Sequence, residues 1–207
     1  MDRKKFLKNM GLGSAAIALA ACGTTQELGE DEDCKLTHLD DKGPFYFRGS
    51  SETVNLNYTN LPGEDMLVSG TVYSGEGTGT PLAGVKIDIW HCDSEGNYHP
   101  NDGGIINNEN SDKMALRGFV MTDKNGKFSF KSILPGLYGR RSRHIHYILS
   151  IKGHTDLVTQ SYFEGDPRIP IDSLSKTAGE CRIVKFDKSG ELYTGVMNFN
   201  LQKKGRT

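Results

Sequence analysis

The fold of this chain is decided by the stretch Pro135-Gly136-Leu137-Tyr138-Gly139-Arg140-Arg141-Ser142-Arg143-His144-Ile145-His146-Tyr147-Ile148-Leu149-Ser150-Ile151. In its second half, apolar residues at the odd positions alternate with histidine, isoleucine and serine at the even ones, which is the period of a β-strand. His144 and His146 therefore leave the same face of the strand, about 6–7 Å apart along it, and can converge on one metal ion. Pro135-Gly136 interrupts the chain just before, so a loop with Tyr138 can fold back toward them.

A lone His-x-His pair predicts a metal site only weakly, because most such histidines lie at the surface or hydrogen-bond to a neighbour. Here other candidate ligand and charged residues lie close to the pair in the sequence or upstream of it. Tyr138 precedes it by six residues and Arg141 by three, and Tyr98 lies further upstream. We therefore interpret the histidines and the two tyrosines as candidate ligands of one metal centre.

Length and charge limit the class of protein. The chain has 207 residues and a formal net charge of −1, so one domain is the default. It has no excess of lysine and arginine and no basic stripe, which argues against nucleic acid as a partner.

The N-terminus predicts export. Basic residues precede a short small-residue, apolar run that ends in Leu19-Ala20-Ala21-Cys22. The run is too short to span a bilayer, which needs about 20 apolar residues. We expect residues 1–21 to be a cleaved signal peptide of the bacterial lipoprotein type. Cys22 is then lipidated and anchors the protein to the membrane on the periplasmic or cell-surface side. An uncleaved anchor is the alternative, and the choice between general and twin-arginine export stays open.

Residues 22–33 are polar and acidic and predict a flexible tether, which leaves residues 34–207 as the folded domain. Cys34 and Cys181 could form a disulfide in an oxidising compartment, and Cys92 is expected to be a small buried residue. There is no Cys-x-x-Cys pair, so a thiolate zinc or iron–sulfur site is not expected.

Short strands and turns fill the domain and predict an all-β sandwich or barrel. Strands are expected at 68–73 and 85–90. A hairpin is expected at 119–121 and 127–130 around Asp123–Gly126, and another pair of strands, 184–186 and 192–201, around Asp187–Gly190. The polar segment 101–113 predicts a long loop over the site.

The ligand types favour ferric iron. Phenolates are hard anionic donors with a free pKa near 10, so a strong Lewis acid must hold them ionised. Two phenolates and two neutral imidazoles favour a trivalent over a divalent cation, whereas zinc usually takes histidine, cysteine or carboxylate. Arg141 is placed to supply a permanent positive charge, while Arg140 and Arg143 are expected at the surface.

Several further motifs occur in a set order. With the stretch quoted above, the chain resembles the intradiol ring-cleavage dioxygenases from about residue 43 to its last strand, on Gly43-Pro44-Phe45-Tyr46, Ile89-Trp90-His91-Cys92-Asp93-Ser94-Glu95-Gly96-Asn97-Tyr98, Leu116-Arg117-Gly118, Thr122-Asp123 and Thr159-Gln160-Ser161-Tyr162-Phe163-Glu164-Gly165-Asp166-Pro167.

The resemblance implies a β-sandwich around a non-haem Fe(III), and an enzyme that inserts both atoms of O2 between the two hydroxylated carbons of a catechol to give a cis,cis-muconate-type diacid. It implies that Tyr98, Tyr138, His144 and His146 are the iron ligands. It also implies that Tyr138 swings away when substrate binds, and that Arg141 and Gln160 face the substrate.

Other readings stay open. The alternative function is a non-enzymatic β-sandwich surface lipoprotein that binds a ligand or a partner. Catechol-cleaving members carry a helical dimerisation segment, whereas this chain has only a short polar tether, so it looks more like the protocatechuate-type core or the exported members. The identity of the catechol and a homo-oligomeric state are left undecided. His91, His99 and His154 are expected at the surface.

Overall fold

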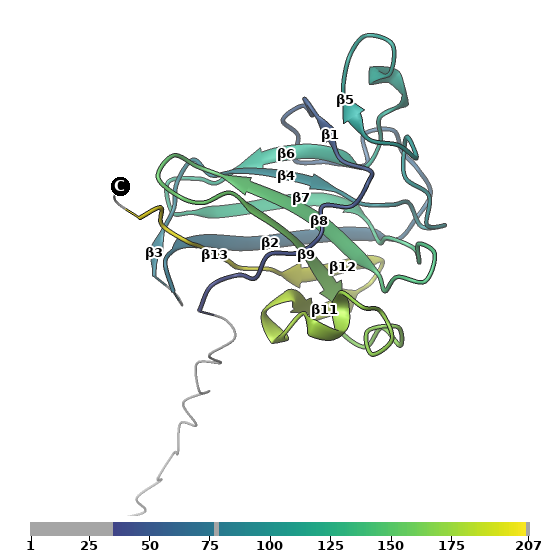
Figure 1. Cartoon of the computed structure of the whole chain (residues 1–207). Coiled ribbons are helices and arrows are strands. Elements are labelled where there is room, and N and C mark those ends of the chain that lie inside the picture. Colours follow the sequence, from purple (N-terminus) through teal and green to yellow (C-terminus); the bar gives the residue numbers. More distant parts are fainter. Residues whose placement is uncertain (1–34, 77–78, 206–207) are drawn as a thin grey trace, which may run out of the picture.

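The structure is a computed structural model that describes residues 35–76 and 79–205. The predicted signal peptide, the lipidation site Cys22, the tether and Cys34 lie outside the described residues. Two sheets pack face to face, and the described part of the chain contains no α-helix (Figure 1). Its only helical turns are the short 3-10 segments η2, η3 and η4, at Ser111–Lys113, Ser175–Thr177 and Glu180–Arg182. The expected all-β sandwich is therefore confirmed.

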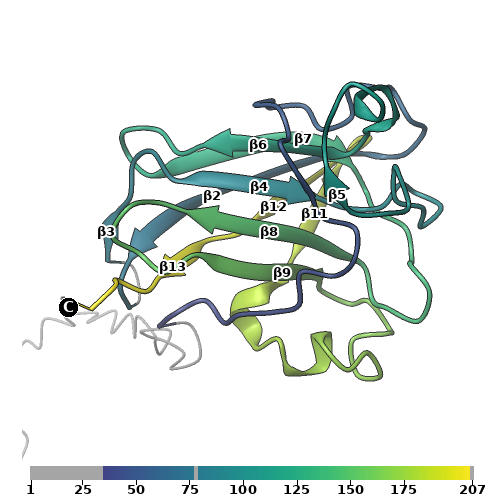
Figure 2. The same cartoon turned by 45° about the horizontal axis from the view of Figure 1, so that its top comes forward.

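The first sheet carries the two candidate histidines. Its order is β10-β9-β8-β4-β6, formed by Ile183–Val184, Leu157–Phe163, His144–Ser150, Lys86–Trp90 and Arg117–Met121. All neighbours are antiparallel except β10 and β9. Figure 2 shows β6, β4, β8 and β9 side by side, with the N-terminal segment crossing over them.

The second sheet is built around one long strand, β2 (Asp65–Ser74). On one side β2 pairs in parallel with β12 (Leu192–Val196) and then β13 (Phe199–Leu201), and β12 pairs with β11 (Phe186–Ser189). On the other side it pairs with β7 (Lys127–Ile133) and β3 (Thr80–Pro81). A separate two-stranded sheet joins β1 (Phe47–Arg48) to β5 (Gly104–Ile105).

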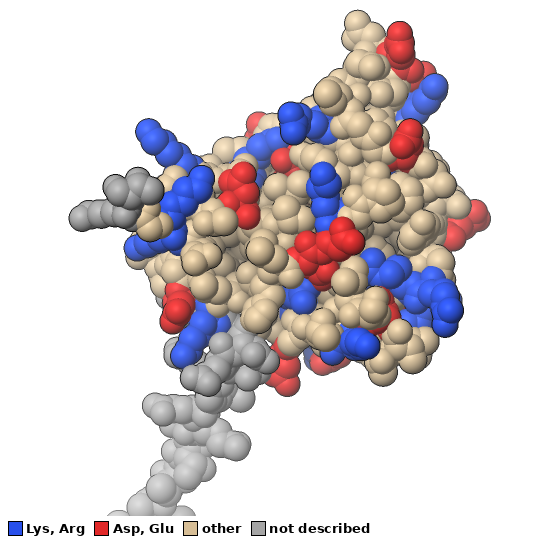
Figure 3. Space-filling model, in the orientation of Figure 1, with Lys and Arg blue, Asp and Glu red and all other residues tan. Residues whose placement is uncertain are grey.

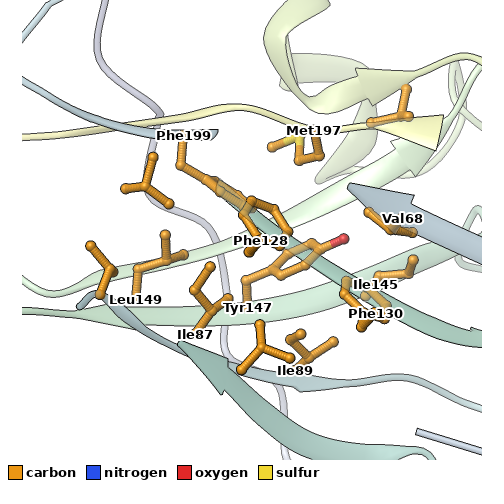
Figure 4. Close-up of a cluster of buried hydrophobic side chains, with 14 of the residues drawn as sticks. Val68, Ile87, Ile89, Phe128, Phe130, Ile145, Tyr147, Leu149, Met197 and Phe199 are labelled. Atoms are coloured by element: carbon orange, nitrogen blue, oxygen red, sulfur yellow. The ribbon is translucent and has the colours of Figure 1, made fainter. Parts of the chain in front are cut away.

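The core lies between the two sheets and follows the predicted alternation. From β8, Ile145, Tyr147 and Leu149 point inward and are fully buried. They pack with side chains of both sheets, which Figure 4 labels as Val68, Ile87, Ile89, Phe128, Phe130, Met197 and Phe199. Burying each such side chain contributes about 1.5–3 kcal/mol. This burial fixes the register of β8, so His144 and His146 must lie on the outer face of the sheet.

The expected hairpin around Asp123–Gly126 is wrong. The turn forms as predicted, because the N–H of Gly126 donates to the carbonyl of Asp123. The strands then separate: β6 pairs with β4 in the first sheet, and β7 pairs with β2 in the second. The physical reason is that Val120 and Phe128 both have to reach the core from opposite sides. The turn therefore links the two sheets instead of closing a hairpin.

The third turn also differs from the expectation. Asp187 and Lys188 belong to β11, which pairs with β12, and the chain reverses at Gly190 and Glu191. The expected strand 192–201 is two strands, β12 and β13, which follow the same side of β2 and are interrupted at Met197 and Asn198. The close approach at this point requires Gly70, because a Cβ there would lie 1.7 Å from the carbonyl oxygen of Met197.

The cysteines and the surface complete the description. Cys92 is buried and free, as expected. Cys181 is disulfide-bonded. Acidic and basic side chains are interspersed on the face drawn in Figure 3. Within residues 35–76 and 79–205, no helix is long and apolar enough to cross a membrane.

Candidate metal centre

The candidate site is built on a row of side chains across the outer face of the first sheet. Strand register places Arg117 of β6, Trp90 of β4, His146 of β8 and Gln160 of β9 directly opposite one another. Directly paired residues of an antiparallel sheet share a face, so the four side chains form one buried row. The indole of Trp90 stacks flat on the imidazole of His146, with ring centroids 4.8 Å apart and planes 5° apart.

Tyr98 meets both histidines. Its hydroxyl lies 3.1 Å from Nε2 of His144 and 3.0 Å from Nε2 of His146. All three side chains are almost completely buried. The ring of Phe45 stacks on that of Tyr98 at a centroid distance of 4.2 Å. Three of the four predicted ligands therefore bring their donor atoms to one point, under an aromatic cover.

A tight turn delivers Tyr98 to this point. A carboxylate oxygen of Asp93 accepts hydrogen bonds from the N–H groups of Glu95 and Asn97, and the carbonyl of Asp93 accepts one from Gly96. The ring of His99 bonds to the other carboxylate oxygen at 2.7 Å. The loop between β4 and β5 is thus closed on itself, which fixes the tyrosine over the sheet.

Tyr138 joins the same cluster from the loop before β8. Gly136 docks against the Tyr98 loop so closely that a Cβ would lie 2.4 Å from the carbonyl oxygen of Ser94. The half-buried ring of Tyr138 then stands edge-on to Tyr98 and to Phe45, at centroid distances of 5.4 and 5.3 Å. The loop therefore folds back as far as Tyr98: the ring of Tyr138 contacts the ring of Tyr98, whose hydroxyl in turn reaches the histidine pair.

Both imidazoles are held in the form that binds metals. Burial, and then the positive charge of Arg141, lower the pKa of His144 to about 4. Burial also puts the pKa of His146 well below its usual value. The Nδ1 of His144 lies 2.7 Å from the carbonyl oxygen of Ser142, which can only accept, so this nitrogen carries the proton. Nε2 of His144 is therefore a free lone pair that faces Tyr98.

The phenol of Tyr98 is neutral without a metal. Burial raises its pKa, although the charges of Arg141 and Arg117 act in the opposite direction. A bound cation would lower the pKa of the Tyr98 phenol, because a metal ion dominates the local charge and binds the ionised form of a ligand.

The donors fit a ferric ion better than the common alternatives. Among the described residues, no group of three or more histidine, cysteine, aspartate or glutamate side chains could hold a metal. The side-chain oxygen that lies within hydrogen-bond distance of both imidazoles is the phenol of Tyr98, so a metal bound to the histidine pair would lie next to a phenol oxygen. Buried phenols and neutral imidazoles match Fe(III), and they do not match the usual ligand sets of zinc or non-haem Fe(II).

Arg141 and Gln160, which the resemblance implied would face the substrate, are hydrogen-bonded to each other beside this cluster. Nη2 of Arg141 donates to Oε1 of Gln160 at 2.8 Å, and the amide nitrogen of Gln160 donates to the carbonyl of Asp41 at 2.6 Å. Nε of Arg141 donates to both carboxylate oxygens of Asp172, at 3.0 and 2.9 Å. No hydrogen bond joins Nη1 of Arg141 to another described residue, so these protons are available to a ligand.

The sequence did not identify the roles of Arg117 and Asp172. The buried guanidinium of Arg117 donates to the carbonyls of Phe45, His99 and Pro100, and burial lowers its pKa to about 10. It thereby ties Phe45, whose ring stacks on Tyr98, to the loop that carries Tyr98. The Leu-Arg-Gly motif marked this arginine, but no local pattern predicts three backbone acceptors from distant segments. For Asp172, the only local signal is its residue type, because aspartates often accept a hydrogen bond from the backbone two residues on, as Asp172 does from Leu174.

Two of the expected surface histidines are buried. His91 bonds to the carbonyl of Cys92 and to the hydroxyl of Ser132 on the opposite sheet, each at 2.7 Å. His154 bonds to Ser74 at 2.7 Å. Both fill polar positions inside the sandwich, so the expectation was wrong because a neutral imidazole with a partner is tolerated there.

The cover over His146 comes from the segment before β1, not from the long loop 101–113 as expected. Gly43 has a φ of +68°, and a Cβ there would lie 3.3 Å from Cε1 of His146. The ring of Tyr46 packs on Trp90 at 4.9 Å. The segment 101–113 instead contains β5 and η2, and β5 pairs with β1.

Known proteins with similar sequences are dioxygenases. The profile of a family described as Dioxygenase matches residues 42–203. Chlorocatechol 1,2-dioxygenase of Rhodococcus opacus is 31% identical over 78% of this chain and 70% of its own. Hydroxyquinol 1,2-dioxygenase of Rhizobium sp. is 35% identical over 54% of this chain and 42% of its own. The chain spans about half the length of several such relatives.

Solved structures with a similar fold are also dioxygenases. The dioxygenase domain of a dioxygenase–carbohydrate-binding fusion from Streptomyces sp. SirexAA-E is 30% identical, with a TM-score of 0.70, covering 82% of this chain and 99% of that one. Catechol 1,2-dioxygenase from Pseudomonas arvilla C-1 is 25% identical, with a TM-score of 0.68, covering 82% of this chain and 63% of that one.

Proposed function

Because the chain belongs to the intradiol ring-cleavage dioxygenases, a family of oxidoreductases, we propose that it opens the ring of a catechol between its two hydroxylated carbons, with Fe(III) and O2. The observation that carries the proposal is the convergence of the Tyr98 hydroxyl and two neutral imidazoles within hydrogen-bond distance. The product is a cis,cis-muconate-type diacid.

In this proposal Tyr98, Tyr138, His144 and His146 hold the iron. When bound, the ferric ion supplies Lewis-acid and one-electron chemistry that makes the coordinated substrate reactive toward O2. A catechol that binds as a dianion must lose two protons, one to a base of the protein and one to solvent. Of the two phenols, Tyr138 is half-buried and Tyr98 is buried, so the hydroxyl oxygen of Tyr138 is the one that can turn away and take up a substrate proton.

Arg141 stabilises the negative charge of the substrate. Its Nη1 protons have no partner among the described residues, while Nε and Nη2 are fixed by Asp172 and Gln160. Donors that are held in place before the reaction lower the energy of developing charge without reorganisation. Phe45 and Trp90 form apolar walls that keep water from the reacting atoms.

The substrate is proposed only at the level of a catechol-type ring. The relatives above are named for chlorocatechol, catechol and hydroxyquinol, which differ only in ring substituents. A panel of these compounds and 3,4-dihydroxybenzoate, assayed for the absorbance of the ring-opened diacid, ranks the candidates by kcat/KM.

We also propose that the protein is exported and lipid-anchored through Cys22. The lipoprotein-type ending Leu19-Ala20-Ala21-Cys22 supports this proposal, and so does the disulfide at Cys181, since such bonds persist in oxidising compartments. Labelling of cells with a radioactive fatty acid tests it. We expect label in the wild type and none in Cys22→Ser; equal labelling of both would contradict the proposal.

The decisive test is iron loading. Protein expressed with iron is expected to be reddish from phenolate-to-iron charge transfer, to change colour with catechol, and to release muconate. Tyr98→Phe should bind iron at least about 10–100-fold more weakly while its circular dichroism stays that of a β-protein. A colourless, iron-free and inactive wild type would favour the alternative, a β-sandwich surface lipoprotein that binds a ligand or partner.

A further inference from the structure

The loop after β9 grips the loop that carries Tyr138 and Arg141. Asp166 accepts a hydrogen bond from the N–H of Arg143 at 2.8 Å. Arg168 donates through Nη1 to the carbonyls of Gly139 and Arg141, at 2.9 and 3.2 Å. Asp172, further along the same loop, binds Arg141 and Ser142 of the loop that carries Tyr138. The two loops are therefore held together by charged side chains: Asp166 and Arg168 bind backbone atoms of the other loop, and Asp172 pairs with the side chain of Arg141.

Asp172 is the most highly connected carboxylate of this contact. Besides the two bonds from Nε of Arg141, it accepts hydrogen bonds from the N–H and the hydroxyl of Ser142, at 3.0 and 2.9 Å, and from the N–H of Leu174 at 3.1 Å. Its side chain is 1% exposed. Although burial acts to raise it, these hydrogen bonds lower the pKa of Asp172 to about 2, so the group is a carboxylate at all ordinary pH values.

These bonds reach two parts of the proposed machinery. On one branch, Asp172 fixes Nε of Arg141 and so turns Nη2 toward Gln160 and leaves Nη1 for substrate. On the other branch, it fixes the backbone of Ser142, whose carbonyl accepts the Nδ1 proton of His144. That bond points Nε2 of His144 at Tyr98.

We propose that Asp172 is a positioning residue for the site: it sets the guanidinium of Arg141 in its working orientation and, through Ser142, orients the imidazole of His144. The inference rests on the proposed ring-cleaving function. The simpler alternative is that Asp172 only caps the turn before η3 through Leu174, in which case its removal would act on stability and not through Arg141.

A double-mutant cycle with catechol as substrate separates these readings. Asp172→Asn keeps the size of the side chain and removes its charge. We expect kcat to fall about 10–100-fold, the range for loss of a residue that orients a ligand, with KM within about 3-fold of wild type. In the Arg141→Ala background the same substitution should lower kcat by a clearly smaller factor than in the wild-type background, because only the branch through Ser142 and His144 remains.

Asp166→Asn is the matched control. Asp166 lies on the same loop, but its carboxylate binds backbone N–H groups of Arg143 and Arg168 and not the side chain of Arg141. We expect its kcat to stay within about 2-fold of wild type. Asp172→Glu, which retains the charge, should recover part of the lost rate and shows whether the asparagine variant failed for lack of charge.

A second readout needs no turnover. In the metal-free full chain, amide hydrogen exchange should quicken at Ser142 in Asp172→Asn and at Arg143 in Asp166→Asn. Losses of kcat that add in full in the double variant, a control as slow as Asp172→Asn, or unchanged exchange at Ser142 would each overturn the inference. A wild type that releases no muconate would refute the proposed function instead, while the exchange measurement would still test the placement by Asp172.

Discussion

Replacing Gly43 by alanine should damage the metal centre more than it damages the fold. Gly43 has a φ of +68°, where a non-glycine residue costs roughly 1–2 kcal/mol. For a domain of this size, that loss lowers the melting temperature by about 2–8 °C. The new methyl group would also lie 3.3 Å from Cε1 and 3.9 Å from Nε2 of His146. The first distance is tighter than an ordinary carbon–carbon contact.

The imidazole of His146 cannot yield freely, because one of its faces is stacked on the buried indole of Trp90. A shift of a few tenths of an ångström therefore misdirects Nε2. We expect iron binding about 10-fold weaker, the lower end of the range for loss of support to a metal ligand. Titration of the metal-free protein with ferric iron, followed by charge-transfer absorbance, measures this effect, and thermal unfolding of the same metal-free protein measures stability.

Gly84→Ala is the control. Gly84 has a φ of +73°, nothing lies within 4 Å of its added Cβ, and it precedes β4 at the end of the strand opposite to Trp90. It should show the same fall in melting temperature and unchanged iron affinity. Equal iron affinity in Gly43→Ala and Gly84→Ala would refute the argument that Gly43 supports His146.

Three further outcomes are expected. First, the metal-free protein should lose stability as pH falls from 6.5 toward 4, by about 1.4 kcal/mol per pH unit for each imidazole of pKa about 4, because the unfolded chain binds the extra protons. The free energy of unfolding, measured by urea titration at each pH, should fall less steeply with pH in His91→Gln than in the wild type. An equal pH dependence in the two proteins would contradict this. Second, Arg117→Met should lose about 3–4 kcal/mol in the same assay, because three buried carbonyls lose their donor. A loss below about 1 kcal/mol would show that they find other partners. Third, burial raises the pKa of Cys92 to about 12, so iodoacetamide at pH 8 should label this thiol only after denaturation. Labelling of the native protein at the rate of a free thiol would show that the site opens.

The parts of the fold that the sequence predicts are those encoded by local periodicity. The alternation in β8 places three apolar residues in the core and both histidines outside it, because a one-residue slip would invert the whole strand. The turn at Asp123–Gly126 was also predictable from its residues. Which strands it joins was not, because pairing partners depend on long-range packing of Val120 and Phe128 and not on turn chemistry.

The same distinction holds for the site. Side chains in recognisable motifs, such as Tyr98 and Gln160, could be chosen from the sequence. Arg117 is held by backbone carbonyls, which every residue has, so the sequence does not show its partners. Asp172 lies in a segment without a motif, and only the folded chain brings it to Arg141.

The position of the histidines outside the sandwich has a consequence for the order of assembly. The apolar interior is formed mainly by side chains of the two sheets and includes none of the proposed iron ligands. The donor atoms lie on the outer face of the first sheet, where the ring of Phe45 stacks on Tyr98. The apolar core of the sandwich does not depend on the metal ion. The polypeptide can therefore fold first and bind iron afterwards. Chelation should then bleach the protein reversibly, and returning ferric iron should restore its colour without a refolding step.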